Sequence, residues 1–580
     1  MLFLPFRFVY LLLRMIVWPF FWVRWKRVAP KGAYLEIEID GAVTDIPSPP
    51  TFFSRFRKQS VSLSALSELI ESADRDPRIV GFILSLRSFR QGMASAISLH
   101  NLLCKAKQNG RELIVFLPFG GETKELLIAS AANRIIAAPQ TSLSPLGFSI
   151  AARYVRGALD RIGLVPEVYA RGIYKSAGEP LIRTSMSERE REQLDAILDE
   201  LYARFEEALA SGRRVSREKA RELIDNAPYF HQEAVSAGLI DKTAYEDELP
   251  AALKSGENDP VLVPAAAYLQ AKRRLKLPRL LSKPIIGVLP IHGAIASENP
   301  LTAELGMATD GRLISAIRLA RLDPRIRAVI LHINSPGGSA LASDRIHHEL
   351  QSLAAEKPLI AYMSNVAASG GYYVAAAAKT IVSQSTTMTG SIGVVATRVV
   401  LDPFLEKLGI RSEVLKRGAH ADMIEPTRTL RDDEKAILER EIDGIYKGFL
   451  QVVAEGRKQP LDQIEKIAEG RVWIGKDAKN VGLVDQIGGF DIALSAARAA
   501  LGKGGGKLMP AALPIENDSI PPLAPPDKKA AQMLLGISQL IGAFNGRPRA
   551  LHIELQFAAL SLSGERVLAF CPSSLQFAGE

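Results

Sequence analysis

The sequence predicts an α/β fold that occurs twice, in two tandem domains related by an internal duplication. Two observations carry this prediction. Short motifs recur along the chain at a nearly constant offset, and short β-rich runs alternate with longer amphipathic or alanine-rich stretches, which is typical of a parallel sheet with crossover helices. The chain has 580 residues, which is longer than a domain built on a single hydrophobic core usually is, so we expect two domains. Its 47% hydrophobic content indicates a globular protein.

The repeat is easiest to see in a four-residue motif. Asp-Pro-Arg-Ile occurs at 76–79 and again at 323–326, and each copy precedes an apolar run that we expect to be a buried strand. Further pairs keep nearly the same spacing: Arg-Gly at 171–172 and 417–418, and Gly-Leu-(Ile or Val)-Asp at 238–241 and 482–485. Chance would not preserve this register, so the two halves are copies of one unit.

The repeat predicts four segments along the chain. They are an N-terminal membrane anchor at 1–31, a first α/β repeat at 32–255, a second α/β repeat at 256–502, and a Gly/Pro-rich linker with a C-terminal tail at 503–580. In the second repeat we expect strands near 286–291, 328–333 and 359–362, and helices near 313–322, 340–355 and 371–378. Long charged helices at 187–211 and 431–456 are expected to close the two repeats.

The net charge of +9 is concentrated at the N-terminus, where basic residues alternate with aromatic rings and no acidic residue occurs before residue 30. This composition suits a membrane interface, because aromatic rings and cations both lie near lipid headgroups. The apolar run at 2–23 could span a bilayer, but Arg7 and Arg14 within it would each cost roughly 2.5 to 3.5 kcal/mol at the bilayer centre. An imperfect span and an anchor lying in the interface both remain open.

The composition argues against several classes of protein. The two cysteines, Cys104 and Cys571, are too few and too far apart for a zinc cluster or a dense disulfide framework. The chain has no basic patch tied to a nucleic-acid motif, and the pair Gly370-Gly371 lacks the spacing and the lysine of a phosphate-binding loop. We therefore expect no metal, no nucleotide cofactor and no nucleic-acid partner.

Two serine- and glycine-rich segments could carry chemistry. Residues 334–339 (Asn-Ser-Pro-Gly-Gly-Ser) join a predicted strand to a predicted helix, where glycines would let N–H groups face a cleft, as an oxyanion hole requires. A tight turn with Ser339 as a helix N-cap would have the same sequence. Residues 389–393 (Thr-Gly-Ser-Ile-Gly) hold Ser391 between glycines, which leaves room for a substrate carbonyl near its hydroxyl, although a simple turn also explains them.

The third candidate is Lys175. A lysine acts as a general base only when it is neutral, so burial would have to lower its pKa from about 10.4 to about 7 to 8. Read singly, it would be an ordinary solvated lysine. The repeat changes this interpretation, because Ser391 aligns with Pro145 and Lys175 aligns with Ala421. Each half lacks what the other supplies, which is expected if both contribute to one site. The aligned positions also lack the histidine and acid of a Ser/His/Asp triad.

These motifs resemble those of the signal peptide peptidase A (protease IV) family in its long tandem-domain form. The resemblance runs from about residue 32 to about residue 501 and includes 174–177 (Tyr-Lys-Ser-Ala), 334–339, 389–393 and 471–475 (Arg-Val-Trp-Ile-Gly). It implies a Clp protease/crotonase-like fold for each repeat and a serine endopeptidase with a Ser/Lys dyad. The role of nucleophile falls on Ser391, and that of general base on Lys175.

The resemblance implies further properties. We expect a homotetramer on the bacterial cytoplasmic (inner) membrane, in contact with lipid, with catalytic domains on the periplasmic side and cleaved signal peptides as substrates. Some family members use an additional hydroxyl near the lysine, for which Ser412 is the candidate. In the mechanism we expect, an acyl-enzyme forms on Ser391 and the oxyanion binds N–H groups of Gly338, Gly337 and Ile392.

Two alternative functions remain. A crotonase-like enzyme acting on acyl thioesters would keep the fold and the glycine-lined oxyanion hole without needing the two residues of the dyad. A catalytically inactive membrane scaffold would need neither the dyad nor the oxyanion hole.

Overall fold

The structure, a computed structural model, describes residues 4–47, 61–253, 260–277, 283–299, 302–303, 305–506, 508–515 and 567–570. The chain forms two compact units. Among the described residues, unit 1 comprises those up to Phe148 and those from Leu201 to Pro284, and unit 2 comprises Ser149–Glu200 and those from Ile285 to Phe570. Unit 2 thus combines a segment of the first sequence repeat with the second repeat.

Unit 1 is built on a six-stranded parallel sheet in the order β10-β1-β2-β3-β5-β9. Unit 1 also contains a small three-stranded sheet in the order β4-β6-β8. The elements are α1 Leu4–Val28, β1 Ala33–Gly41, α2 Leu63–Asp74, β2 Ile79–Phe89, α3 Met93–Gln108, β3 Glu112–Leu117, β4 Gly121–Glu122, α4 Thr123–Ala129, β5 Arg134–Ala137, β6 Ser142–Ser144, α8 Arg217–Asp225, β8 Tyr229–Phe230, α9 His231–Ser236, β9 Lys242–Thr243, α10 Leu249–Ala252, β10 Val261–Pro264 and α11 Ala265–Leu275.

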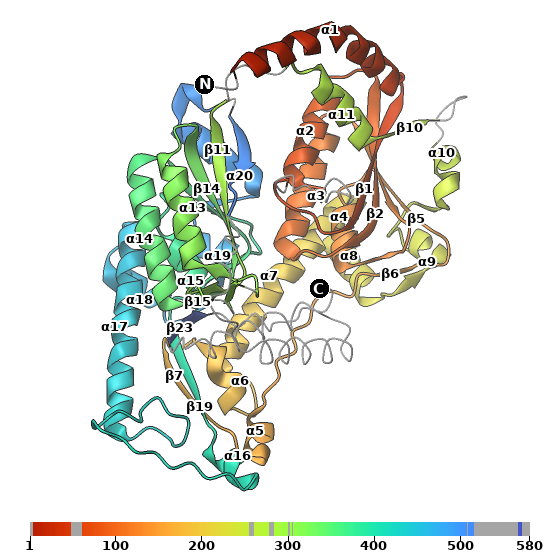
Figure 1. Cartoon of the computed structure of the whole chain (residues 1–580). Helices are drawn as coiled ribbons and strands as arrows, with labels where there is room; N and C mark the ends of the chain where they lie inside the picture. The colour runs from red at the N-terminus through yellow and green to blue at the C-terminus, as the bar shows by residue number, and fades with distance from the viewer. Residues whose placement is uncertain are drawn as a thin grey trace. The chain divides into compact units, whose positions relative to one another are not determined.

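Unit 2 contains two sheets, one in the order β20-β18-β16-β14-β11-β22 with β17 and β21 alongside, and one in the order β13-β12-β15-β23-β19-β7. Helices α13 and α14 lie side by side, and α13 packs against β11 and β14 of the larger sheet (Figure 1). The elements are α5 Arg156–Ile162, β7 Val165–Arg171, α6 Glu179–Ile182, β11 Ile285–His292, β12 Ile295–Ala296, β13 Ala308–Thr309, α13 Asp310–Leu322, β14 Ile326–Ser335, β15 Gly337–Ser339, α14 Ala340–Glu356, β16 Leu359–Ala368, α15 Gly370–Ala375, β17 Thr380–Ser383, β18 Met388–Gly390, β19 Val394–Val400, α16 Asp402–Lys407, α17 Asp432–Arg457, α18 Leu461–Ile467, β20 Val472–Ile474, α19 Gly475–Asn480, β21 Gln486–Ile487, α20 Phe490–Ala500, β22 Met509–Ala512 and β23 Val567–Phe570.

The elements expected in the second repeat are confirmed. The three strands are β11, β14 and β16, which pair in parallel, and the three helices are α13, α14 and α15. The two long charged helices are α7 (Glu188–Arg213), which runs through the point where the chain passes from unit 2 to unit 1, and α17. The core of unit 2 is formed by the larger sheet together with α13, α14, α15 and α17, and Leu331, Ile346 and Tyr372 are completely buried in it.

The repeated Asp-Pro-Arg-Ile motif is a tight turn that begins a strand in each unit. Asp76 accepts hydrogen bonds from the backbone N–H of Arg78 at 3.2 Å and from its guanidinium at 2.9 Å. Asp323 accepts the same two bonds from Arg325, at 2.8 and 3.0 Å. In both copies the aspartate accepts the backbone N–H and the guanidinium of the arginine two residues later, so β2 and β14 start in the same way. This shared turn explains why the motif marks the repeat.

Helix α1 packs along α11 within unit 1. The Trp25 and Tyr268 rings have centroids 4.8 Å apart, and Arg14 donates to the carbonyl of Arg274 at 2.9 Å. The predicted membrane anchor is therefore helical where it is described. Among the residues that the structure describes, none of the helices combines the length and the apolar character needed to cross a membrane.

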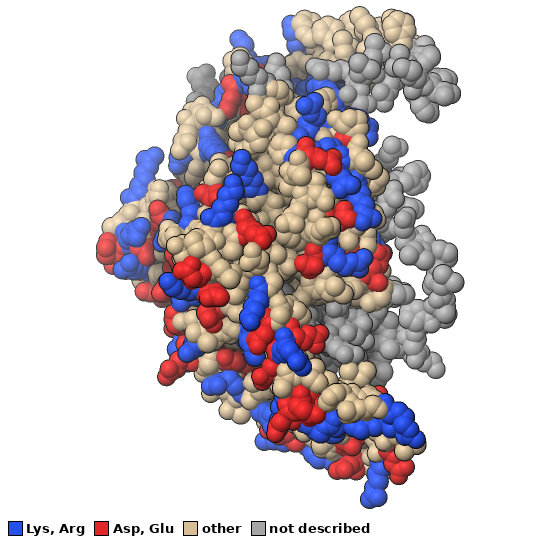
Figure 2. All heavy atoms as spheres, turned by 90° about the vertical axis from the view of Figure 1, so that its left-hand side faces the viewer, with Lys and Arg blue, Asp and Glu red and all other residues tan. Residues whose placement is uncertain are grey.

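Charged residues are mixed on the face of the molecule in Figure 2. Lysine and arginine side chains there are interspersed with aspartate and glutamate, and no continuous basic patch covers that face.

Candidate active site

A two-stranded antiparallel ribbon within unit 2, formed by β7 and β19, sets the position of the candidate base. Arg171 at the end of β7 pairs with Val394 at the start of β19. This residue pair therefore brings the start of the loop that leads to Lys175 next to the end of the loop that follows Ser391. A strand from the first sequence repeat is in this way joined to a strand from the second.

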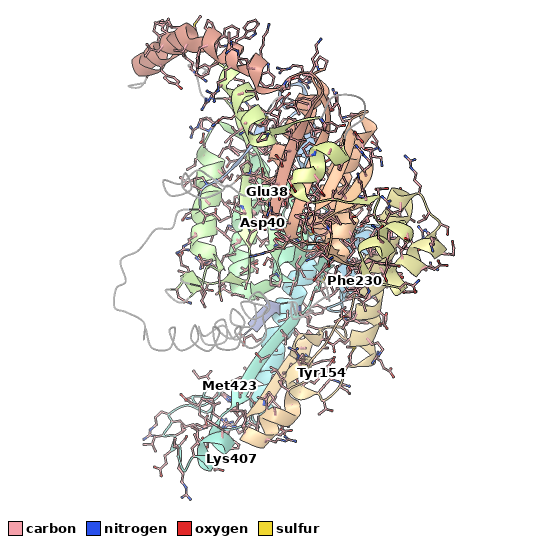
Figure 3. All side chains as sticks on the ribbon, turned by 90° about the vertical axis from the view of Figure 1, so that its right-hand side faces the viewer. Glu38, Asp40, Tyr154, Phe230, Lys407 and Met423 are labelled. Atoms are coloured by element: carbon pink, nitrogen blue, oxygen red, sulfur yellow. The ribbon has the colours of Figure 1, made fainter. Side chains whose placement is uncertain are left out.

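Side-chain contacts hold this ribbon along its length. Glu167 on β7 forms an ion pair with Arg398 on β19, and both side chains are largely buried. Burial and the neighbouring Glu167 carboxylate raise the pKa of Tyr169 to about 12, so this phenol stays protonated. At the end of the ribbon away from Ser391, Lys407 of α16 donates to the carbonyl of Arg161 at 2.7 Å (Figure 3). The ribbon is thus clamped along β7 and β19 and at its distal end.

The backbone at 469–471 connects the lysine loop to the serine loop. Its first carbonyl accepts from the N–H of Tyr174 at 2.8 Å, its central N–H donates to the carbonyl of Ile392 at 2.8 Å, and its last carbonyl accepts from the N–H of Ser391 at 2.7 Å. A Cβ atom added to Gly470 would lie 2.7 Å from the backbone nitrogen of Lys175, so the close approach requires glycine here. This bridge accounts for part of the motif at 471–475.

Lys175 and Ser391 meet in the interior of unit 2. The Lys175 side-chain nitrogen, Nζ, lies 3.0 Å from Ser391 Oγ, 2.9 Å from the Ser391 carbonyl oxygen and 2.8 Å from Ser369 Oγ. Lys175 is 6% exposed, Ser391 1% and Ser369 0%. These three hydrogen bonds all go to uncharged oxygen atoms. A buried amine among neutral oxygens is the environment that disfavours the ammonium form.

Both serines that contact Lys175 have left-handed backbone conformations. Ser391 has φ of 51° and Ser369 has φ of 54°, in a region that residues other than glycine seldom adopt. Such strain costs of order 1–3 kcal/mol per residue and is concentrated at functional sites. The Ser369 N–H donates to the carbonyl of Gly390 at 2.7 Å, which fixes the two strained turns against each other.

The predicted oxyanion segment lies where β14 gives way to α14. Gly337 and Gly338 have φ of 102° and 152°, and a Cβ atom on Gly338 would lie 2.0 Å from the carbonyl oxygen of Ile295, so only glycine fits. The Gly337 N–H donates to Ser335 Oγ at 3.2 Å. Ser339 Oγ accepts from the N–H of Ala342 at 3.2 Å and caps α14, so the structural explanation of this serine is also correct.

The hydroxyl predicted to assist the lysine requires a correction. Ser412 is exposed, on the segment between α16 and α17. The second hydroxyl within hydrogen-bonding distance of Lys175 Nζ is that of Ser369, at the junction of β16 and α15. Ser369 was not among the residues predicted from the sequence, although the Ser-Gly-Gly of residues 369–371, at the start of the helix expected near 371–378, was a signal that could have found it.

The described parts of the chain contain no group of three or more histidine, cysteine, aspartate or glutamate side chains placed to hold a metal ion.

Comparison with known proteins places this arrangement in context. The family model described as "Peptidase family S49" matches the chain twice, at residues 106–258 and 351–503. The two matched segments correspond to the two sequence repeats. Ser391 lies in the second segment and Lys175 lies in the first.

Individual relatives agree with the family match. The chain is 33% identical over 480 residues to "Serine protease SPPA, chloroplastic" of Arabidopsis thaliana, covering 82% of this chain and 70% of the relative. It is 32% identical over 496 residues to "Protease 4" of Salmonella typhi, covering 80% and 78%. A shorter match, 34% over 182 residues, joins it to "Putative signal peptide peptidase SppA" of Enterococcus faecium, covering 31% of this chain and 53% of the relative.

Proposed function

Because the chain belongs to peptidase family S49 and is a serine peptidase, we propose that Ser391 is its nucleophile and Lys175 its general base. The observation that carries the proposal is the contact of 3.0 Å between Lys175 Nζ and Ser391 Oγ, both almost fully buried. A nucleophile and a base within hydrogen-bonding distance, with the base oriented by a third group, form the arrangement that covalent catalysis requires. Family membership favours this function over an acyl-thioester enzyme or an inactive scaffold.

The three contacts of Lys175 suit a neutral amine. A neutral amine has two N–H donors and one lone pair, and it is surrounded by three oxygen atoms. With the two N–H groups directed to Ser369 Oγ and to the Ser391 carbonyl, the lone pair faces the Ser391 hydroxyl. The amine can then accept the hydroxyl proton while Oγ attacks the carbonyl carbon of a peptide bond.

In the remaining steps, Lys175 passes on the proton that it took from the Ser391 hydroxyl. The ammonium of Lys175 donates it to the leaving amine as the C–N bond breaks, which leaves an acyl-enzyme on Ser391 and a neutral lysine. The amine then deprotonates a water molecule that attacks the ester, and the acid product is released as Ser391 regains its proton. Of the proposed oxyanion donors, we favour the N–H groups of Gly338 and Ile392, because the Gly337 N–H already donates to Ser335.

A covalent probe tests the dyad directly and also predicts a pH dependence. Burial disfavours the ammonium, so we expect the pKa of Lys175 to lie below its ordinary value of about 10.4. Since only the neutral amine activates Ser391, the rate of labelling by a serine-directed fluorophosphonate should rise with pH up to that pKa and then level off. Labelling should map to Ser391 by mass spectrometry and be lost in Lys175→Met. A rate that is flat between about pH 6 and 9 would contradict a lysine base.

Ser369 is proposed as a positioning residue for the lysine. In Ser369→Ala, Lys175 loses one acceptor, so we expect kcat to fall about tenfold with little change in KM. The midpoint of the pH–rate profile should also move to lower pH, because a hydrogen bond that stabilises the ammonium has been removed.

A second variant separates the lost hydroxyl from the strained backbone. Ser369→Gly also lacks the hydroxyl but tolerates the positive φ of this position. If both variants lose activity equally, the hydroxyl is responsible. If Ser369→Gly is fully active, Ser369 has no positioning role.

The finer biological assignment is also a proposal. We propose that each repeat has a Clp protease/crotonase-like fold, that the peptidase is a homotetramer at the bacterial inner membrane, and that its catalytic domains face the periplasm and degrade cleaved signal peptides. The name of the Enterococcus faecium relative supports this substrate. Helix α1 supports the membrane, because its exposed side chains include Ile16 and Phe20 together with basic residues, a composition suited to lying in the lipid interface.

A further inference from the structure

A buried glutamine links the lysine loop to the strand beside the nucleophile. Gln193 lies in the part of helix α7 that belongs to unit 2, and it is 3% exposed. Its Nε2 donates to the carbonyl of Tyr174, the residue before Lys175, at 3.2 Å, and its Oε1 accepts from the N–H of Val472 at 2.8 Å. One side-chain amide thus joins the segment that carries the proposed base to strand β20.

The bond to Val472 reaches the nucleophile through the sheet. Val472 pairs with Gly390, the residue before Ser391, in the antiparallel ladder of β18 and β20. The Ser391 N–H donates to the carbonyl of Arg471 at 2.7 Å, so the ladder bond lies beside this pair and the N–H of Val472 points away from β18. In the described part of the chain β20 is the last strand at this end of the sheet, and the acceptor for that N–H comes from Gln193.

The bond to Tyr174 fixes the start of the lysine. The N–H of Tyr174 donates to the carbonyl of Glu469 at 2.8 Å, and its carbonyl accepts from Gln193, so the backbone of this residue is held on both sides. Lys175 follows directly, and its Nζ lies 3.0 Å from Ser391 Oγ. A shift of the Tyr174 carbonyl would therefore move the amine away from the hydroxyl.

We propose that Gln193 is a positioning residue for the general base, because its amide holds the backbone before Lys175 against the strand that flanks Ser391. This inference rests on the proposed function of Ser391 and Lys175. The two partners require one donor and one acceptor, which an amide supplies and an ionised carboxylate does not. The second N–H of the amide donates to the carbonyl of Arg189 at 3.4 Å, so the partners determine the orientation of the side chain.

Charged side chains cover this buried amide on its outer side. Glu192 accepts from the Tyr174 hydroxyl at 3.0 Å and pairs with Arg471 at 2.9 Å, and the Arg471 guanidinium lies 5.0 Å from the centre of the Tyr174 ring. The Glu192 side chain is half exposed, so this ion pair contributes little on its own. The bonds that hold the lysine loop in place are therefore those of Gln193, which water does not reach.

Gln193→Met tests the role, since methionine has a similar length but lacks both the N–H donor and the amide oxygen. We expect kcat to fall by about 10- to 10²-fold with little change in KM, as displacement of a catalytic group by about 1 Å has an effect of this size. The rate at which a fluorophosphonate labels Ser391 should fall by the same factor. A residue that only stabilises the fold would lower the unfolding temperature and leave these rates unchanged.

The pH–rate profile gives a second readout. Water that reaches a displaced amine stabilises its ammonium form, so in Gln193→Met the midpoint of the profile should move to higher pH. This shift is opposite to the one expected for Ser369→Ala. A midpoint equal to that of the wild type, together with unchanged kcat, would overturn the positioning role.

Two further variants separate the two bonds from general packing. Gln193→Glu has the same shape and keeps an acceptor for the N–H of Val472, but its carboxylate cannot donate to the Tyr174 carbonyl, so kcat should fall here as well. Gln91→Met is the matched control: Gln91 in unit 1 also accepts a backbone N–H, that of Val43 at 3.0 Å, and its substitution should leave kcat and the midpoint unchanged.

Lys175→Met, measured alongside, separates failure of this inference from failure of the dyad. If Lys175→Met is inactive while both Gln193 variants label and turn over like the wild type, the positioning role is wrong and the dyad stands. Labelling of Ser391 at the wild-type rate in Lys175→Met would contradict the dyad, and the role of Gln193 with it.

Discussion

Ser391→Ala and Lys175→Met should each abolish peptide hydrolysis, lowering kcat by about 10³-fold or more. The first variant removes the atom that would form the acyl-enzyme. The second removes the group that would take its proton, and methionine has nearly the same length and fits a buried position. Because the two residues act as one unit, the double variant should be no slower than either single variant. The measurement is steady-state cleavage of an apolar fluorogenic peptide, with folding followed by circular dichroism.

Matched controls separate catalysis from packing. Ser98 is also a buried serine whose hydroxyl bonds a carbonyl, that of Ala94 at 3.0 Å, and Lys357 donates to the carbonyls of Ala320 and Asp323 at 2.7 Å each. Ser98→Ala and Lys357→Met should cost stability, on the order of 1 kcal/mol, and keep kcat. Wild-type turnover in either dyad variant, or equal losses in the controls, would show that the dyad is wrong.

Gly393→Ala should lower kcat by about 10²-fold, since displacement of a catalytic group by roughly 1 Å has an effect of this size. A Cβ atom at Gly393 would lie 2.7 Å from the carbonyl oxygen of Arg171, 2.9 Å from Gly470 Cα and 3.2 Å from Lys175 Cδ. The first two contacts are with backbone and cannot yield easily. The methyl group therefore pushes apart the ribbon, the bridge at 469–471 and the lysine.

Gly448→Ala is the control for this substitution. Gly448 lies within α17, and nothing is found within 4 Å of the position of an added Cβ atom, so alanine should be neutral or slightly stabilising there. Thermal unfolding should show that Gly393→Ala remains folded at the assay temperature, so that lost turnover reports the geometry of the site. Full activity in Gly393→Ala would mean that the lysine is not held as tightly as these distances require.

Much of the fold of the second repeat could be predicted because it depends on local pattern. The apolar runs that became β11, β14 and β16 are buried on both faces in a parallel sheet, and such strands read as continuous hydrophobic runs. The long helices α7 and α17 showed the amphipathic spacing of surface helices. The duplication was visible because the aspartate and arginine of the Asp-Pro-Arg-Ile turn form hydrogen bonds with each other, so the turn has the same sequence in both copies.

Other features lay beyond prediction. Ser369 contacts Lys175 only because the turn between β16 and α15 has a positive φ at this serine, whereas the hydroxyl predicted from the sequence was that of Ser412, which is exposed. The strand β23 is four residues long and lies in a tail without clear periodicity. Its pairing depends on two strands about 170 to 230 residues earlier in the chain, which no local pattern encodes.

By itself, the sequence determined that this chain is duplicated and that its halves are α/β, and it predicted Ser391 and Lys175 as a pair because each is absent from the opposite repeat. Alignment of the repeats carries that information without any coordinates. Only the tertiary structure decided that the pairing of β7 with β19 brings Nζ to 3.0 Å from Oγ, which hydroxyl completes the lysine's environment, and which strand lies against the glycines. Contacts between distant segments depend on how strands and turns pack in space. The free energy of that packing comes from residues far apart in the chain, so no local sequence pattern predicts it.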